Sequence, residues 1–498
     1  MKNKFLKNGP RSRFSSNFAN ADFTKNQQLE NSLQGKKVLL IGLGLLGGGI
    51  NAANWLIEQG AKLTITDLKT NEQLAPSLGQ LKNKSRIKFV LGEHREKDFL
   101  DNEIVVVNPD VPLSSPFLKL AVKHKKQIEN ELTLFWKFSQ SKNIIAVTGT
   151  RGKTTTTNWI GHFVKSARKD TQVAGNSPQN PLLDAISKSK PKTPFVLEVP
   201  SFLLEHSLNS GFAPKVAVIT NISPDHLNRY RNLSHYALTK ANIFKKQTAN
   251  DYLILGCEDN WTKTFLKQKP KSKVLFFSTK QLPVGEEGCF VSKNRRIVIR
   301  FKGKESVVCD SGIFVTSWGA HNLKNLLATV LAARVFGLPL NKIIPATKTL
   351  PQIKFREELV YSRGGLEIYN DTAATSPEAT IAALERFAKP AKNLILITGG
   401  TDRNLEFKKL AETMKSKLNP KQVIFLNGSA TQKLKKELGW ERAITLETLE
   451  ECLDNALKMA RKSLPTVILF SPGAKSFEKF KSEYDRGEQF NTLIKKVK

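Results

Sequence analysis

The sequence predicts an α/β protein of three domains, because one pattern occurs three times along the chain. Each block begins with a short apolar run typical of a buried strand, passes through a glycine turn and continues with helical periodicity. The blocks are KKVLLIGLGLLGGGINAANWLIEQG from Lys36, NIIAVTGTRGKTTTTNWIGHFV from Asn143 and KNLILITGGTDRNLEFKKLAETM from Lys392. At 498 residues the chain is also too long for one ordinary hydrophobic core.

The domain boundaries are expected near residues 130–143 and 350–355. We predict a basic tail over residues 1–33 that stays mobile, and an N-terminal domain over residues 34–140. A central domain over residues 141–350 and a C-terminal domain over residues 351–498 are expected to follow. Within the central domain, residues 284–309 alternate apolar and polar side chains between turns. This alternation predicts two or three antiparallel strands there.

The composition describes a soluble globular protein with a large positive charge. The hydrophobic content is 40%, no apolar run is long enough to span a membrane, and the first residues lack the apolar segment of a signal peptide. The four cysteines show no metal-ligand spacing, so a cytoplasmic protein without membrane insertion is expected. The formal charge of +34 leaves a basic nucleic-acid-binding protein as an alternative. The lysines are spread over the whole length, however, so no specific nucleic acid is expected.

The glycine turn of the first block has the spacing of a nucleotide-binding turn. Gly42, Gly44 and Gly47 follow a strand-like run in G-x-G-x-x-G order, and Asp67 closes a second such run about twenty residues on. Glycines permit close approach of the backbone, and the following helix N-terminus favours phosphate. A tight strand-to-helix turn without a nucleotide would also need small residues. A dehydrogenase, predicted from this turn alone, is an alternative function.

The second block contains a phosphate loop. Gly149, Thr150, Arg151, Gly152, Lys153 and Thr154 follow a strand-like run and open a helix. Backbone N–H groups, a lysine for the β- and γ-phosphates and a hydroxyl for Mg²⁺ are the groups that bind a nucleoside triphosphate. Val147 stands where the strict phosphate-loop pattern has glycine, so the loop takes a shortened T-G-T-x-G-K-T form.

Two polar positions after neighbouring strand-like runs predict metal ligands. Glu198 ends the run FVLEV, and Asp225-His226 follows VAVITNIS. Parallel strands bring their carboxyl ends to one edge, so a carboxylate and an imidazole there are expected beside the phosphate loop, where they would hold a second Mg²⁺. Further on, Tyr236 and Lys240 share one helical face. From the residues alone, Lys240 would be a solvated lysine and Asn322 a helix cap.

Together these segments resemble the Mur ligase family. TGTRGKTT, LEVPSF, NISPDH, YxxxK, GAHNxxN, FREE, NDTAAT, GGTDR and SPGAKSF follow one another in the family's order across residues 35–492. The C-terminal segments are most similar to the branch that adds D-glutamate to UDP-N-acetylmuramoyl-L-alanine. The resemblance implies a Rossmann-like UDP-binding domain, a central ATPase domain with a parallel sheet and a C-terminal Rossmann-like domain that binds the amino acid. It also implies ATP-dependent amide formation through an acyl phosphate, by a cytoplasmic enzyme expected to be a monomer.

The resemblance assigns roles residue by residue. Lys153, His226, Lys240 and Arg356 match catalytic positions, and Thr154, Glu198, His226 and Lys240 match positions near two Mg²⁺ sites, with Lys240 carbamylated. The positions that match ATP contacts are Gly149, Thr150, Arg151, Gly152, Lys153, Thr154, Thr155, Asn322, Asn325 and Asp371. The positions that match contacts to the UDP-muramoyl substrate or to glutamate are Gly44, Leu45, Leu46, Gly47, Asp67, Asn176, Thr375, Arg403 and Ser476.

The chain departs from the pattern of the D-glutamate-adding branch at several positions. Ala373 stands where that pattern has a lysine, and Arg403 replaces a second lysine with the charge kept. Asp110 lies in a segment that usually reads SPG, and Pro200 replaces a serine. These changes concern substrate contacts, so a sibling ligase that adds another amino acid, or L-glutamate, remains the alternative.

Overall fold

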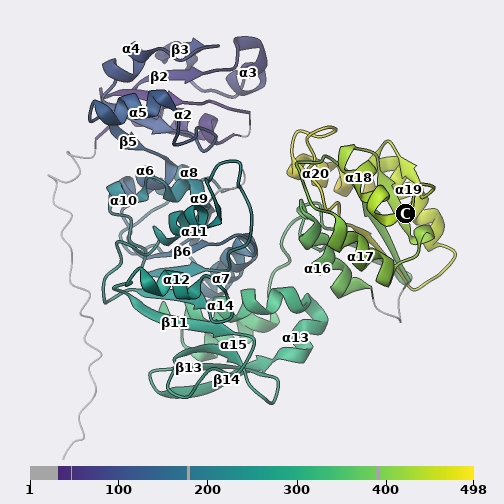
Figure 1. Cartoon of the computed structure of the whole chain (residues 1–498). Helices are drawn as coiled ribbons and strands as arrows, with labels where there is room; N and C mark the ends of the chain where they lie inside the picture. The colour runs from purple at the N-terminus through teal and green to yellow at the C-terminus, as the bar shows by residue number, and fades with distance from the viewer. Residues whose placement is uncertain (1–31, 46, 176–179, 389–392, 498) are drawn as a thin grey trace, which may run out of the picture.

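The computed structural model describes residues 32–45, 47–175, 180–388 and 393–497, which form three separate β-sheets with their helices. Figure 1 shows the N-terminal sheet in purple above the central sheet in teal, with the C-terminal part in yellow-green beside them. The predicted α/β fold class is confirmed. The predicted mobile tail falls almost entirely on residues 1–31, which lie outside the described residues.

The N-terminal sheet is parallel throughout, with the strand order β3-β2-β1-β4-β5. This order places β1 at the centre, so the glycine turn after it lies between strands on both sides. The elements are β1 (Lys37–Ile41), α2 (Gly48–Glu58), β2 (Lys62–Asp67), α3 (Asn71–Leu78), η1 (Lys84–Arg86), β3 (Ile87–Leu91), α4 (Glu96–Asp101), β4 (Ile104–Val107), α5 (Pro116–Lys123), β5 (Gln127–Glu129) and the connecting α6 (Glu131–Phe138).

The central sheet has nine strands in the order β14-β13-β12-β11-β10-β9-β6-β8-β7. Its strands up to β12 (Gly288–Val291) are parallel, whereas β13 (Arg296–Phe301) and β14 (Lys304–Asp310) extend it in antiparallel fashion. The sheet is therefore mixed rather than simply parallel, and the predicted antiparallel strands are confirmed. The other strands are β6 (Ile144–Thr148), β7 (Gln172–Gly175), β8 (Phe195–Glu198), β9 (Val216–Ile219), β10 (Tyr252–Gly256) and β11 (Lys273–Ser278). The helices are α7 (Lys153–Ala167), α8 (Leu182–Ile186), α9 (Ser201–Leu204), α10 (Ser207–Ser210), α11 (Leu233–Ala241), α12 (Thr262–Lys267), α13 (Ser311–Trp318), η2 (Ala320–Asn322), α14 (Leu323–Val335) and α15 (Leu340–Lys348).

The C-terminal sheet has the order β15-β16-β20-β17-β18-β19, parallel except for the β15–β16 hairpin at one edge. Its elements are β15 (Glu358–Arg363), β16 (Leu366–Asn370), α16 (Pro377–Phe387), β17 (Asn393–Thr398), α17 (Lys408–Lys417), η3 (Pro420–Gln422), β18 (Val423–Leu426), α18 (Ser429–Leu438), β19 (Thr445–Leu446), α19 (Leu449–Ala460), β20 (Thr466–Phe470) and α20 (Glu483–Ile494).

Each sheet carries an apolar core on both faces, which explains why the central strands are continuously hydrophobic. Successive strand side chains point to opposite faces. In β6, Ile145 and Val147 pack with α7 and α14, whereas Ile144 and Ala146 pack with residues of α6 and α11. The strands β1 and β17 divide their side chains between two clusters in the same way. Two-sided burial therefore predicts the strands better than apolar–polar alternation does.

The N-terminal and central domains share apolar and polar contacts. Leu134 of α6 and Leu183 of α8 belong to the core cluster of the N-terminal sheet. Arg229, which is paired with the buried Glu205, donates hydrogen bonds to the backbone carbonyls of Pro109 and Val111. The loop beside the glycine turn is thus fixed to the central domain.

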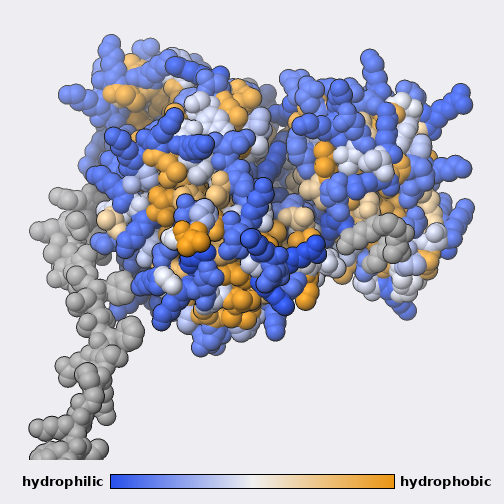
Figure 2. All heavy atoms as spheres, turned by 60° about the horizontal axis from the view of Figure 1, so that its bottom comes forward, coloured by the Kyte–Doolittle hydropathy of each residue, from blue (hydrophilic) through white to orange (hydrophobic). Residues whose placement is uncertain are grey.

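The surface shown in Figure 2 is mostly hydrophilic, with small apolar patches between charged side chains. Within the described residues, no helix has both the length and the apolar character needed to cross a bilayer.

Arg486 of α20 holds together the loops at the carboxyl ends of the C-terminal strands. Its side chain is fully buried and donates to Thr372 Oγ1 at 2.9 Å, Thr372 O at 2.9 Å, Ala474 O at 3.2 Å and Lys475 O at 3.2 Å. Burial lowers the pKa of its guanidinium to about 10. A single buried cation therefore satisfies backbone carbonyls from two loops that are about 100 residues apart in sequence.

Replacing Arg486 by methionine is expected to destabilise the C-terminal domain by about 2–4 kcal/mol, because several buried carbonyls lose a charged donor. The measurement is the urea midpoint of unfolding, followed by circular dichroism. Gln489→Met, an exposed position on the same helix, is the matched control. Equal midpoints for the two variants would contradict this role of Arg486.

Candidate active site

The phosphate loop lies between β6 and α7 and has a conformation that only small residues allow. Gly149 has φ +142°, and a Cβ there would lie 1.9 Å from Thr220 Oγ1. Gly152 has φ +80°, and a Cβ there would lie 2.2 Å from Asn325 Oδ1. The loop ends at the N-terminus of the 15-residue helix α7, where free N–H groups and the helix dipole favour an anion. The geometry therefore fits the phosphates of a nucleotide.

Two side chains after β9 hold the backbone of this loop. Asn221 Oδ1 accepts from Arg151 N at 3.0 Å, and Asn221 Nδ2 donates to Arg151 O at 3.0 Å. Thr220 Oγ1 donates to the same carbonyl at 2.6 Å. Sequence reasoning missed both residues, although polar side chains at the end of a strand beside β6 were a signal for them.

Lys153 opens α7, and its Nζ donates to Thr150 O at 3.0 Å. Burial lowers the pKa of its ammonium, while the charge of Glu198 opposes that shift. Within the described ranges, no carboxylate forms an ion pair with Lys153. A partly buried lysine without an anionic partner at a helix N-terminus is suited to bind phosphate oxygens.

Glu198 ends β8, and Asp225 and His226 follow β9, so these residues lie after the two strands that flank β6 and its phosphate loop. Val147 of β6 is paired in register with Glu198 of β8. Asp225 Oδ2 lies 3.8 Å from His226 Nε2 and 3.8 Å from Arg151 Nη1. Burial opposes ionisation of Asp225, but the charges of His226, Arg151 and Lys475 outweigh it and lower the pKa of the carboxyl.

His226 has a backbone and a protonation state suited to ligand binding. Its φ of +53° is uncommon outside glycine and often marks functional turns. Burial lowers the pKa of its imidazole, although the charge of Asp225 opposes the shift. A neutral imidazole at physiological pH is available as a metal ligand.

The residues present supply part of a Mg²⁺ coordination shell. No group of three His, Cys, Asp or Glu side chains with metal-binding geometry occurs in the part of the chain that the structure describes. A metal here would therefore need other oxygen ligands, such as the hydroxyl of Thr154 or nucleotide phosphates. The Thr154 hydroxyl lies at the loop, where it accepts from Arg356 Nη2 at 3.3 Å. The donor set fits Mg²⁺ only together with bound phosphate.

Lys240 is a buried lysine beside the phosphate loop, so the alternative of a solvated surface lysine is wrong. The residue is 1% exposed, and its Nζ donates to Gly149 O at 2.9 Å and lies 4.6 Å from the centre of the Tyr236 ring. The predicted sharing of one helical face by Tyr236 and Lys240 is confirmed. Burial, followed by the nearby charge of Lys153, lowers the pKa of Lys240 well below that of a free lysine. Its neutral amine is thereby favoured.

Asn322 and Asn325 lie against the phosphate loop. Asn325 Nδ2 donates to Asn322 Oδ1 at 2.9 Å, and Asn325 Oδ1 lies 3.3 Å from Thr156 Oγ1. Asn322 occupies the N-cap position of α14, but its side chain makes no capping hydrogen bond and instead donates to Trp318 O at 2.9 Å. The alternative of a helix cap is therefore right in position, since Asn322 is the N-cap residue of α14, but its side chain does not cap the helix.

Arg356 brings the C-terminal domain to the phosphate loop through its contact with Thr154. Arg151 of the loop also lies 3.9 Å from Glu378 of α16. Asp371 accepts from Ser471 Oγ at 2.7 Å. Burial, with a contribution from the charge of Glu357, raises the pKa of Asp371 to about 8. The carboxyl ends of the C-terminal strands therefore face the nucleotide site.

The predicted glutamate-binding residues occupy the same end of the C-terminal sheet. Thr375 Oγ1 accepts from Lys475 Nζ at 3.3 Å. Ser476 Oγ is buried and has no hydrogen-bond partner among the described residues. Arg403 is exposed and stacks on the ring of Phe477 at 4.9 Å. Sequence reasoning missed Lys475, because its position beside Thr375 depends on folding across 100 residues.

The N-terminal residues arrange the glycine turn. Asp67 Oδ2 accepts from Leu43 N at 2.9 Å and Gly44 N at 3.0 Å, so its carboxylate supports the turn in addition to any ligand contact. Leu45 is 51% exposed, and Gly47 is the N-terminal boundary residue of α2. Leu46 and Asn176 lie outside the described residues. The turn is therefore open to a ligand on the side of Leu45.

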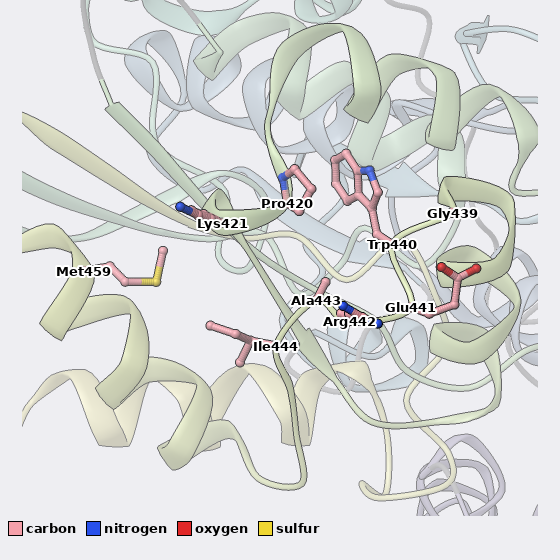
Figure 3. Close-up of a pocket in the computed structure, with 9 residues that line it drawn as sticks. All are labelled: Pro420, Lys421, Gly439, Trp440, Glu441, Arg442, Ala443, Ile444 and Met459. Atoms are coloured by element: carbon pink, nitrogen blue, oxygen red, sulfur yellow. The ribbon is translucent and has the colours of Figure 1, made fainter.

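One open cavity of about 520 Å³ lies away from all these residues (Figure 3). It lies at the amino ends of β18 and β19, and its lining includes Lys421, Trp440, Ile444 and Met459. Ligands of parallel α/β sheets bind at the carboxyl ends of the strands. The cavity is thus separate from the candidate active site.

Family models match three parts of the chain. They are described as Mur ligase MurD-like, N-terminal domain (residues 36–129), Mur ligase middle domain (residues 147–333) and Mur ligase, glutamate ligase domain (residues 355–473). Together they contain the phosphate loop and most residues of the candidate active site, whereas Lys475, Ser476 and Arg486 lie beyond the last match.

Relatives and solved structures match over nearly the full length. The UDP-N-acetylmuramoylalanine–D-glutamate ligase of Roseiflexus sp. is 37% identical, over 93% of this chain and 99% of its own. The enzyme of the same name from Clostridioides difficile is 34% identical, over 94% of this chain and 100% of its own. The solved MurF of Acinetobacter baumannii has the same fold, with a TM-score of 0.59 and 15% identity over 95% of this chain and 99% of its own. The chain belongs to the Mur ligase family.

Proposed function

We propose that this protein joins D-glutamate to UDP-N-acetylmuramoyl-L-alanine at the expense of ATP, in the synthesis of peptidoglycan precursors. The observation that carries this proposal is the near full-length similarity to relatives named for that reaction. The geometry agrees with it, because a phosphate loop meets polar residues of a second domain through Arg356. We further propose a cytoplasmic monomer.

The chemistry requires activation of a carboxylate, which does not react with an amine by itself. A carboxylate oxygen of the alanyl substrate attacks the γ-phosphorus of ATP, and the bond from that phosphorus to the ADP oxygen breaks. The amine of glutamate then attacks the acyl carbon of the resulting acyl phosphate. A C–N bond forms, phosphate leaves with the C–O electron pair, and the amine loses a proton. Both steps need the reactants held close together and the negative charge offset.

The residues of the central domain are proposed to hold ATP and stabilise charge. Lys153 and the backbone of residues 149–152 would bind the β- and γ-phosphates, because the lysine is partly buried without an anionic partner among the described residues. Arg356 would reach the transferred phosphoryl group from the C-terminal side. Thr155, Asn322, Asn325 and Asp371 are proposed as further nucleotide contacts. A solved Mur-type relative, MurF of Thermotoga maritima, is in complex with ADP.

The two substrates are proposed to enter from opposite domains. Gly44, Leu45, Leu46, Gly47, Asp67 and Asn176 would contact the UDP-muramoyl substrate, and Thr375, Arg403 and Ser476 the glutamate. The unpartnered buried hydroxyl of Ser476 supports a ligand on the C-terminal side.

We also propose two Mg²⁺ sites, with Thr154, Glu198, His226 and Lys240 as the protein ligands. Mg²⁺ would neutralise phosphate charge during transfer. An ammonium at position 240 would repel the metal, whereas the neutral form of the amine, which burial favours, can attack CO₂ and lose a proton. The resulting carbamate is an anionic oxygen ligand. The lowered pKa of Lys240 and its contact with Gly149 O support this modification.

Purified protein with Mg-ATP is expected to release phosphate only when both UDP-N-acetylmuramoyl-L-alanine and D-glutamate are present. The expectation follows because activation and amide formation share one site. The measurement is colourimetric phosphate release, with L-glutamate and other amino acids as parallel samples. Release with another amino acid but not with D-glutamate would assign the protein to a sibling ligase.

Lys240→Ala is expected to lower kcat by roughly 100-fold or more, because an anionic ligand for the metal is lost. Added acetate or formate should restore part of the rate by occupying the vacated anionic position. Lys245→Ala, an exposed lysine shortly after α11, is the matched control and should stay active. A fully active Lys240→Ala protein would disprove the carbamate proposal.

A further inference from the structure

Lys475 has a backbone that is fixed from two sides. Thr401 N donates to Lys475 O at 2.9 Å, and Lys475 N donates to Thr401 O at 3.2 Å. Arg486 Nη1 also donates to Lys475 O at 3.2 Å. The segment after β20 is therefore locked to the segment after β17. A side chain that starts from such a fixed backbone can position a ligand.

The surroundings of Lys475 supply cationic and hydroxyl groups rather than a carboxylate. Its Nζ donates to Thr375 Oγ1 at 3.3 Å. No Asp or Glu of the described ranges forms an ion pair with it. The next residue, Ser476, is 2% exposed with an unpartnered hydroxyl. An ammonium and hydroxyls without an internal anion are the groups that recognise a carboxylate.

The two cations of this region differ in position. Lys475 is half-buried, and its partner Thr375 lies just before α16, whose Glu378 is 3.9 Å from Arg151 of the phosphate loop. Arg403 is exposed and stacks on Phe477. Lys475 is thus the cation beside the segment that reaches the phosphate loop, and Arg403 is the outer one.

A dicarboxylic amino acid can place one carboxylate at Lys475 and the other at Arg403 in one orientation. Its reacting amine and its α-carboxylate are bonded to the same carbon, so the carboxylate closest to the reaction centre is the α-carboxylate. The side-chain carboxylate then points outward, toward Arg403. A monocarboxylic amino acid would leave one of the two cations without an anion, which disfavours its binding.

We infer that Lys475 is a specificity-determining residue whose ammonium, together with Thr375, binds the α-carboxylate of the incoming amino acid. This inference rests on the proposed function, because it places a substrate of that reaction. It assigns a role to Lys475, which lies in the SPGAKSF segment but is not among the site residues predicted from the sequence.

The first test is the steady-state kinetics of Lys475→Met, which removes the charge and keeps the length of the side chain. The KM for D-glutamate should rise by roughly tenfold or more, while the KM values for ATP and the UDP-substrate stay within about twofold of wild type. Lys475→Arg keeps the cation and should retain more of the affinity. Lys481→Met, which removes an exposed lysine nearby, is the matched control.

A structural role would give a different result, namely a lower melting temperature together with a loss of kcat at saturating D-glutamate. If Lys475→Met does not fold, the same KM comparison is made with Lys475→Arg and Lys475→Gln. An unchanged KM for D-glutamate in a folded, charge-removed variant overturns the inference while wild-type activity still supports the proposed function. A wild-type protein that releases no phosphate with D-glutamate overturns both.

The second test uses D-glutamine as a competitive inhibitor, because it keeps the α-carboxylate and has a neutral side chain. Its inhibition constant should rise in Lys475→Met and stay near the wild-type value in Arg403→Met. The opposite pattern would show that Lys475 binds the side-chain carboxylate and would overturn the assignment to the α-carboxylate.

Discussion

The excess of positive charge around one loop is the constraint on which the rest of the site depends. Lys153, Lys240, Arg151, Arg356 and Lys475 lie around a region that also holds Glu198 and Asp225, whose charges act on Lys153 and Lys240. Cations taken out of water need anionic partners. The phosphates and carboxylates of the proposed substrates have the charge that this region lacks. The negative charge of the proposed ligands would therefore balance the positive charge of the site.

The sheet topology explains how these charges come together without a local cluster in sequence. β6 lies between β8 and β9, so the segments that follow Thr148, Glu198 and Ile219 converge on one edge although they are separated in sequence. β16, β17 and β20 do the same in the C-terminal sheet. Arg486 then links two loops at that edge by donating hydrogen bonds to Thr372 O and Ala474 O. The order of the strands thereby sets where these charged side chains lie, because each loop begins where a buried strand ends.

The sequence predicted the parts of the site that depend on local pattern. The phosphate loop follows from glycine spacing, and the helical turn between Tyr236 and Lys240 follows from periodicity. The burial of Lys240 did not follow from any local pattern, since a lysine in a helix is usually solvated. Only the packing of α11 on the loop removes this lysine from water. Lys475 and Arg486 were missed because their partners lie about 100 residues away, in loops whose contacts no local pattern encodes.

The two domain boundaries differ in the chemistry of their contacts. Leu134 and Leu183 join the N-terminal and central domains through a shared apolar core. Arg356, Arg151 and Arg386 join the central and C-terminal domains through polar pairs, including a bond from Arg386 Nη2 to Ser317 O at 2.6 Å. Water can replace hydrogen bonds and exposed ion pairs at low cost, but it cannot replace apolar contact. The part proposed to bind the amino acid is therefore attached to the part proposed to bind the nucleotide through contacts that solvent can exchange, so a separation of the two would break these polar pairs at low cost.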